Sequence, residues 1–126
     1  MNLSRLSAEL DLMVAEPGIV GCALVDANTG LVWHARARDG VANADRLWEA
    51  AVDYWRLHDR QSLHFAELGP LGAAVMYHSA GVLAVFPCCR DDPAVLLVSH
   101  GQHQGVDWVA LQRRARAFGD LLRPSG

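Results

Sequence analysis

The sequence predicts an α/β (α+β) fold in which helices sandwich a five-stranded antiparallel sheet, in the order α-β-β-α-β-β-β-α. Three observations lead to this prediction: amphipathic helical patterns at both ends of the chain, a third such pattern in its middle, and apolar strand-length runs joined by short turns. Short connections favour antiparallel pairing, and helices on both sides would cover the sheet. The 126 residues are expected to form one domain, 1–126.

The first three elements follow from local patterns. Leu3, Leu6, Leu10 and Met13 recur at helical spacing, and the helix ends at Glu16-Pro17-Gly18 because proline cannot continue its hydrogen bonds. A strand over Ile19–Asp26 is apolar on both faces, with one face formed by Val20, Cys22 and Leu24 and the other by Ile19, Ala23 and Val25. It is therefore an inner strand. A turn at Asn28 and Gly30, both suited to positive φ, leads into Leu31–Ala35.

The second half of the chain contains a run of strands and a last helix. Ser62–Leu68 has the composition of a short strand, weakened by Glu67 and a histidine. Apolar strands are predicted at Leu71–His78, Val82–Cys88 and Ala94–Ser99, separated by turns. The final helix turns one apolar stripe to the core, formed by Trp108, Leu111, Ala115, Phe118 and Leu122.

The middle helix, Ala44–His58, is the most informative segment. Its charged side chains fall on one narrow stripe, whereas apolar residues fill an arc of about 220° at 100° per residue. One sheet face cannot cover so wide an arc, so the helix is expected to need a second partner. The residues predicted to form this self-association surface are Leu47, Trp48, Ala51, Tyr54, Trp55 and His58.

Composition excludes several functional classes. The net charge of −3 gives no basic field for nucleic-acid phosphates, so no nucleic-acid partner is expected. All eleven basic residues are arginines, which excludes a P-loop lysine, a Schiff-base lysine and a lysine general base. No apolar run has the roughly 20 residues that span a bilayer, and the N-terminus lacks the pattern of a signal peptide. With three cysteines, an odd count, the chain is expected in a reducing cytoplasm, without a membrane partner.

The best metal candidate combines Cys88 and Cys89 with His100 and His103. Adjacent strand residues point to opposite faces, so both thiols do not easily reach one ion, and a core cysteine beside a solvated histidine loop is the favoured interpretation. The vicinal thiols also suggest a redox sensor, which is ranked lower. No metal or cofactor is expected.

Other catalytic candidates are weaker. His78 and Ser79 are neighbours but lack the Gly-x-Ser-x-Gly turn of a hydrolase. Asp91-Asp92 before a proline is typical of a turn rather than of a cation site. The arginines of the last helix favour a solvated face over an acidic-partner site, and none lies in an arginine-finger motif; they are Arg113, Arg114, Arg116 and Arg123. No enzymatic activity is expected.

Several strings resemble the roadblock/LC7 family, whose bacterial members include partners of small Ras-like GTPases. EPGIVGCALVDANTGLVWHA (16–35) looks like the family's opening hairpin, and GVLAVFP (81–87) and AVLLVSH (94–100) are similar to its later strands. The resemblance implies a profilin-like architecture and a homodimer in which middle helices pack together and sheets join at an edge. The segment 62–69 is longer than the family pattern needs, and the aromatics of the middle helix are unusual.

These observations together predict a non-catalytic homodimeric adaptor or regulator that binds a small Ras-like GTPase or another cytoplasmic protein. One alternative is a profilin-like sensor with a ligand cavity lined by Trp48, Trp55 and Tyr77. The other is a metal-binding protein that uses the Cys/His loop.

Overall fold

The computed structural model describes residues 3–38, 45–89 and 94–122. Its helices and strands follow one another in the predicted order, with one additional 3₁₀ helix after the middle helix. The elements are α1 (Leu3–Val14), β1 (Ile19–Asp26), β2 (Val32–Ala37), α2 (Asp45–Arg60), η1 (Ser62–Leu68), β3 (Ala74–His78), β4 (Gly81–Pro87), β5 (Val95–Gly101) and α3 (Trp108–Leu122).

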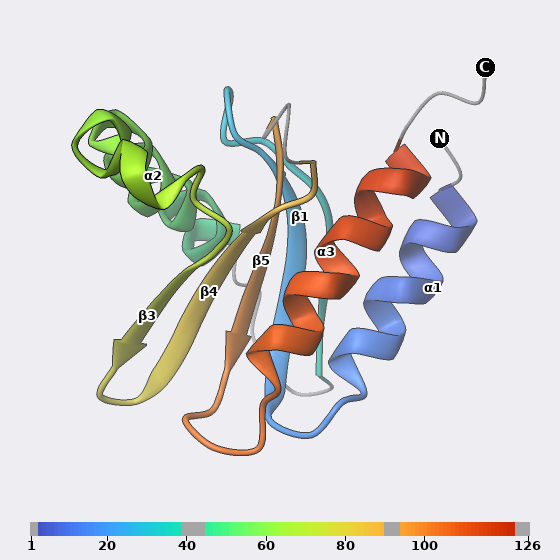
Figure 1. Ribbon diagram of the computed structural model, residues 1–126. Helices are drawn as coiled ribbons and strands as arrows, with labels where there is room; N and C mark the ends of the chain where they lie inside the picture. Colours follow the sequence, from blue (N-terminus) through green and yellow to red (C-terminus); the bar gives the residue numbers. More distant parts are fainter. Residues whose placement is uncertain (1–2, 39–44, 90–93, 123–126) are drawn as a thin grey trace.

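The five strands form one antiparallel sheet in the order β2-β1-β5-β4-β3 (Figure 1). β5, the last strand in the chain, lies between β1 and β4 and so joins the opening hairpin to the later strands. β2 and β3 are the two edge strands. The edge strand β3 follows the α2–η1 segment in chain order.

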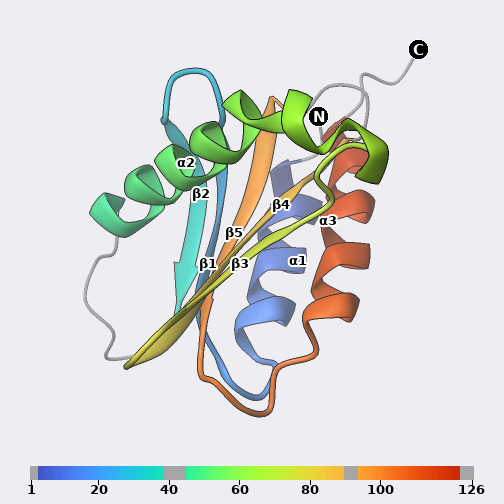
Figure 2. The same cartoon turned by 60° about the vertical axis from the view of Figure 1, so that its left-hand side comes forward.

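Helices cover both faces of the sheet, as predicted. α1 and α3 lie side by side on one face, and α2 crosses the other face alone (Figure 2). The guanidinium of Arg114 on α3 links the paired helices, because it lies 3.5 Å from the Glu9 carboxylate on α1 and 2.5 Å from that of Glu16 just after it. No helix in the described ranges is long and apolar enough to cross a bilayer.

The core beneath α1 and α3 is closed by side chains from both helices. Leu6, Leu10 and Met13 on α1 are fully buried, as the helical spacing predicted, whereas Leu3 of the same stripe is 55% exposed in the first turn of the helix. From α3, Leu111 and Phe118 enter the same cluster. α3 also approaches the end of β4 closely. The lack of a side chain at Gly119 makes this possible, since a Cβ there would collide with the backbone carbonyl of Cys88.

Two glycines shape the opening hairpin and its approach. Gly18 adopts φ +84° where α1 turns into β1, at the Pro-Gly break that the sequence predicted. In the β1–β2 turn, the Asp26 carboxylate accepts hydrogen bonds from the backbone N–H groups of Asn28 and Thr29. Gly30 has φ +79°, whereas Asn28 does not adopt the positive φ that was expected of it.

Two sequence predictions about strands are wrong. Ile19 packs with Cys22 and Leu24 rather than with Ala23 and Val25, because the β1–β5 register shifts between Ile19 and Gly21 and interrupts the strict alternation. The segment Ser62–Leu68 is a 3₁₀ helix rather than a strand. Its hydrogen bonds are local, for example from the N–H of Gly69 to the carbonyl of Ala66.

Candidate interaction surface

Helix α2 divides into three stripes, of which one packs on its own sheet. Trp48, Ala51, Val52 and Trp55 are buried against residues of β1, β3, β4 and β5. Space for the Trp48 ring comes from Gly21, since a Cβ at that position would lie only 3.2 Å from the indole. This stripe therefore belongs to the chain's own second core, the cluster of buried side chains between α2 and the sheet.

The second stripe of α2 is polar and faces the β1–β2 turn. The Arg56 guanidinium donates to the backbone carbonyls of Ala27 and Asn28, the latter at 2.9 Å, and also lies 3.3 Å from the Asp53 carboxylate. These hydrogen bonds fix the rotation of the helix about its axis. The third stripe must therefore face the opposite way, toward the edge strand β3.

That third stripe is apolar and incompletely covered. Tyr54 and Leu57 are 37% and 45% exposed, Ala50 is exposed, and Leu47 is half-buried against the second core. These four residues recur at intervals of three or four and so form one continuous line on the helix. The predicted excess of apolar surface on α2 is thus present, and it remains open after the helix has packed on its sheet.

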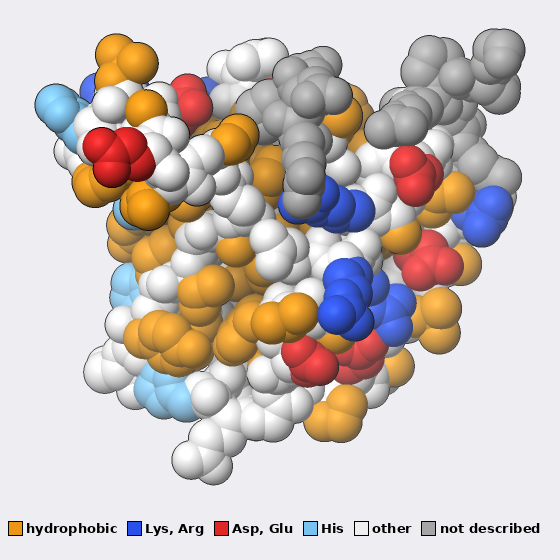
Figure 3. Space-filling view, in the orientation of Figure 1, with side chains coloured by type: hydrophobic (Ala, Val, Ile, Leu, Met, Phe, Trp, Pro, Cys, Tyr) orange, Lys and Arg blue, Asp and Glu red, His pale blue; other side chains and the backbone are white. Residues whose placement is uncertain are grey.

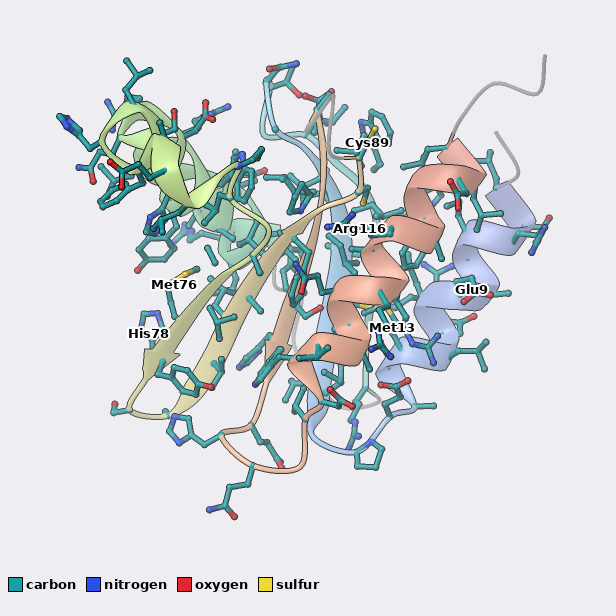
Figure 4. All side chains as sticks on the ribbon, in the orientation of Figure 1. Glu9, Met13, Met76, His78, Cys89 and Arg116 are labelled. Carbon is teal, nitrogen blue, oxygen red and sulfur yellow. The ribbon has the colours of Figure 1, made fainter. Side chains whose placement is uncertain are left out.

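The edge strand β3 extends this apolar stripe onto the sheet. The ring of His78 lies 6.3 Å from that of Tyr54 between centroids. Met76, two residues earlier, contacts the second core and points to the same side of the sheet as His78 (Figure 4). The outer edge of β3 pairs with no strand of the described chain. An edge of this kind readily accepts a further strand.

The 3₁₀ helix η1 presents further apolar side chains to solvent. Leu63 and Leu68 are 88% and 81% exposed, and Phe65 is also exposed. The whole stretch 57–71 contains no buried residue. Hydrophobic side chains gather in this part of the molecule, around the end of α2 and along β3 (Figure 3). Several large exposed apolar side chains gathered in one region are typical of a protein-interaction site.

The structure separates the six residues predicted for self-association into two groups. Trp48, Ala51 and Trp55 are buried in the protomer itself, so no partner reaches them directly. Tyr54 and His58 are exposed and Leu47 is half-buried, so these three lie where a partner helix has access. The residues predicted from the sequence did not include Leu57, although it lies three residues after Tyr54 and therefore on the same side of the helix.

The three residues proposed to line a ligand cavity do not come together. Trp48 and Trp55 lie in the core beneath α2. Tyr77 alternates with Met76 and His78 on β3, and its ring lies near that of His103 in the loop before α3, 6.3 Å between centroids. Tyr77 thus belongs to the opposite face of the sheet from the two tryptophans.

The cysteine and histidine candidates are dispersed as well. No group of three potential metal ligands is found among residues 3–38, 45–89 and 94–122, and Asp91-Asp92 falls outside these ranges. Burial raises the pKa of the Cys88 thiol to about 12, and that of Cys22 likewise to about 12. Both thiols are therefore protonated and unreactive at neutral pH.

The remaining polar candidates lie at the β3–β4 turn and along β5. His78 and Ser79 lie exposed at the β3–β4 turn, and a ring nitrogen of His103 hydrogen-bonds to the His78 carbonyl. Burial lowers the pKa of His100. The hydroxyl of Ser99 is buried in the sheet with no partner in the described chain.

Comparison with known proteins rests on structure alone. No family model matches the sequence, and no curated protein matches it. The structure is similar to a roadblock/LC7 domain from Streptomyces avermitilis, with a TM-score of 0.72 and 18% identity over 98% of this chain and 97% of that one.

Two further solved structures are similar over most of the chain. The gliding protein MglB from Thermus thermophilus has a TM-score of 0.73 and 19% identity, covering 94% of this chain and 88% of its own. MglB from Myxococcus xanthus has a TM-score of 0.73 and 12% identity, covering 96% and 97%. The resemblance inferred from the strand strings is therefore confirmed for the architecture, and the chain has the roadblock/LC7 fold.

Proposed function

We propose that this protein is a non-catalytic, cytoplasmic homodimeric adaptor or regulator that binds a small Ras-like GTPase. The observation that supports self-association is the apolar stripe of α2 beside the unpaired edge of β3. In a two-fold dimer the stripes pack against each other, centred on Tyr54 and Leu57, while the β3 edges of the two sheets join. An interface of about 800 Å² per protomer is ordinary for a stable dimer.

A structural similarity and a sequence resemblance both support the proposal. The roadblock/LC7 fold is shared with MglB, and one MglB structure is described as having a tetrameric arrangement, with a TM-score of 0.74 and 20% identity. The sequence resemblance to the family's bacterial members, partners of small Ras-like GTPases, points to the same class of partner. The residues offered for self-association are Leu47, Ala50, Tyr54, Leu57 and His58, with Trp48, Ala51 and Trp55 supporting them from beneath.

Self-association is tested by placing charge in the stripe. The double substitution Tyr54→Glu and Leu57→Glu introduces two carboxylates that a packed interface would bury without partners, which is strongly unfavourable. Light scattering coupled to size exclusion should show a dimer for the parent protein and a folded monomer for the variant. A matched control, Glu49→Arg with Arg60→Glu, changes two charges on the opposite polar side and should stay dimeric. A monomeric parent, or a variant that stays dimeric, contradicts the proposed interface.

Partner binding is tested separately. A purified small Ras-like GTPase from the same organism, loaded with GDP or with a non-hydrolysable GTP analogue, is titrated against the labelled protein. Tighter binding of one nucleotide state is the expected result, because an adaptor or regulator must distinguish the two states. Absence of binding in both states, for every such GTPase that the organism encodes, contradicts the GTPase role and leaves the dimer question unaffected.

A further inference from the structure

Helix α3 has a hollow on its outer flank, on the opposite face of the sheet from α2. An open depression of about 410 Å³ is lined by Val109, Gln112, Arg113 and Arg116. These residues follow the i, i+3, i+4, i+7 spacing of one helix face. Figure 4 places Arg116 on the flank of α3 that faces away from α1, and the hollow is thus separate from the proposed dimer surface.

The arginines of α3 differ in how they are neutralised. Arg114 points toward α1 and is ion-paired with both Glu9 and Glu16. In contrast, Arg113 and Arg116 form no ion pair with any carboxylate of the described residues. Two positive charges therefore border the hollow without compensation from the described part of the protomer. In Figure 3 basic side chains gather over α3, beside a band of hydrophobic ones.

The hollow has a fixed wall and an apolar component. The side-chain amide of Gln112 donates a hydrogen bond of 2.9 Å to the carbonyl of Gly72, which ties α3 to the segment before β3. A Cβ at Gly72 would lie 2.8 Å from that amide nitrogen, so the end of the Gln112 side chain packs closely against this segment. Val109 is 61% exposed at the start of the row, and Leu71 is exposed next to Gly72. The hollow thus combines two cationic side chains with one apolar side chain, and exposed Leu71 follows in the segment tied to α3.

We propose that this hollow docks an acidic amphipathic helical segment of a partner protein. Arginines three residues apart on a helix match carboxylates at a similar spacing on the ligand, and arginine pairs with carboxylate through two parallel hydrogen bonds. An apolar side chain of the segment packs on Val109 and Leu71. A free anion fits less well, because two solvent-accessible arginines screened by salt bind it weakly and the exposed Val109 and Leu71 remain uncovered.

The net charge of the chain is −3, so general attraction does not explain binding of an acidic ligand. A partner must instead recognise the local pair of arginines. Because the hollow and α2 lie on opposite faces of the sheet, both surfaces are accessible at the same time. The inference is independent of the GTPase assignment and of the dimer.

The test uses the full-length protein and a synthetic amphipathic helix with glutamates three and four residues apart and leucines on the adjoining face. Fluorescence anisotropy should show binding that weakens with salt. The double variant Arg113→Gln and Arg116→Gln should bind about tenfold or more weakly, which corresponds to one lost charge-assisted contact. The matched control Arg46→Gln with Arg60→Gln removes the same charge from exposed positions on α2 and should bind like the parent.

Three results would overturn the inference. The first is equal binding of a peptide in which glutamine replaces every glutamate. The second is an equal loss in the α2 control, which would indicate general attraction only. The third is the same arginine-dependent binding of inorganic phosphate or a single-stranded oligonucleotide at comparable affinity, which would identify an unselective anion site. Unfolding temperatures of all variants, measured alongside, should match the parent because the substituted side chains are not in the core.

Discussion

The two faces of the sheet are covered to different degrees. One face is covered by two helices, α1 and α3, whose apolar stripes are mostly buried in a single cluster, although Leu3 at the start of α1 stays exposed. On the other face one helix packs through four side chains and leaves a neighbouring apolar line open, followed by the exposed η1. The first face is therefore largely covered by its own two helices, whereas the second leaves apolar side chains of α2 and η1 exposed.

The largest expected effects compare the two cores directly. Phe118→Ala, beneath α3, and Trp48→Ala, beneath α2, should each lower the free energy of unfolding by about 3–5 kcal/mol, because both remove a large buried ring. Urea unfolding measures both losses, at several protein concentrations because the proposed dimer would add stability that depends on concentration. A loss below about 1 kcal/mol for Trp48→Ala would show that α2 is not anchored by its own protomer.

Alkaline pH offers a second way to probe the completed face. Cys22 and Cys88 both lie in the core beneath α1 and α3, and burial raises each pKa from an ordinary value of 9.0 to about 12. Above pH 9 the unfolded chain releases these protons and the folded chain does not. The free energy of unfolding should therefore keep its full thiol contribution below pH 9. It should fall between pH 9 and 12, by up to about 1.4 kcal/mol per pH unit for each thiol.

The double variant Cys22→Ala with Cys88→Ala serves as the control for this pH effect. Although truncation lowers its overall stability, it should lose less stability than the parent between about pH 9 and 11. An unchanged slope would attribute the alkaline loss to other groups. In the native parent at about pH 8, a thiol reagent should modify these two cysteines only upon unfolding.

A smaller effect is expected at the link between the paired helices. Arg114→Gln removes both ion pairs to Glu9 and Glu16, which are about one-third exposed, and should cost roughly 0.5–1 kcal/mol at low salt. The difference should shrink in about 1 M salt. Arg113→Gln, one residue away and unpaired among the described residues, is the matched control and should leave the unfolding midpoint unchanged. Equal effects of both substitutions would contradict the pairing.

The smallest effect is predicted where the exposed apolar surface is largest. The triple variant Leu63→Ser, Phe65→Ser and Leu68→Ser should change the free energy of unfolding by less than about 0.5 kcal/mol per site, because none of these side chains is buried. A single Leu111→Ser substitution in the α3 core should cost several-fold more. If the triple variant were strongly destabilised, η1 would be covered already, within the protomer or by its mate.

The sequence predicted the parts of the fold that repeat regularly. Helical spacing identified the stripes of α1 and α3, and apolar strand-length runs located the five strands to within a few residues. The sequence-based prediction failed at two places. Near Ile19 a register shift interrupts the alternation of the strand. At Leu63 and Phe65 the alternating apolar residues resemble a strand, but the segment forms a 3₁₀ helix outside the sheet.

The exposed apolar stripe of α2 was predicted in kind but not residue by residue. The wide apolar arc predicts that α2 needs more than one neighbour, yet periodicity alone does not say which part of the arc meets the sheet. That choice depends on Arg56, whose hydrogen bonds to the β1–β2 turn set the rotation of the helix, and on the room that Gly21 leaves for Trp48. Both are contacts between distant segments, and no local pattern encodes them.

The absence of any buried residue from 57 to 71 has an evolutionary consequence. Substitutions there alter what the molecule shows to its surroundings while leaving the folded framework untouched. Such a stretch can change its binding preferences rapidly, one point mutation at a time, and related chains should differ most in this segment even when their cores remain alike.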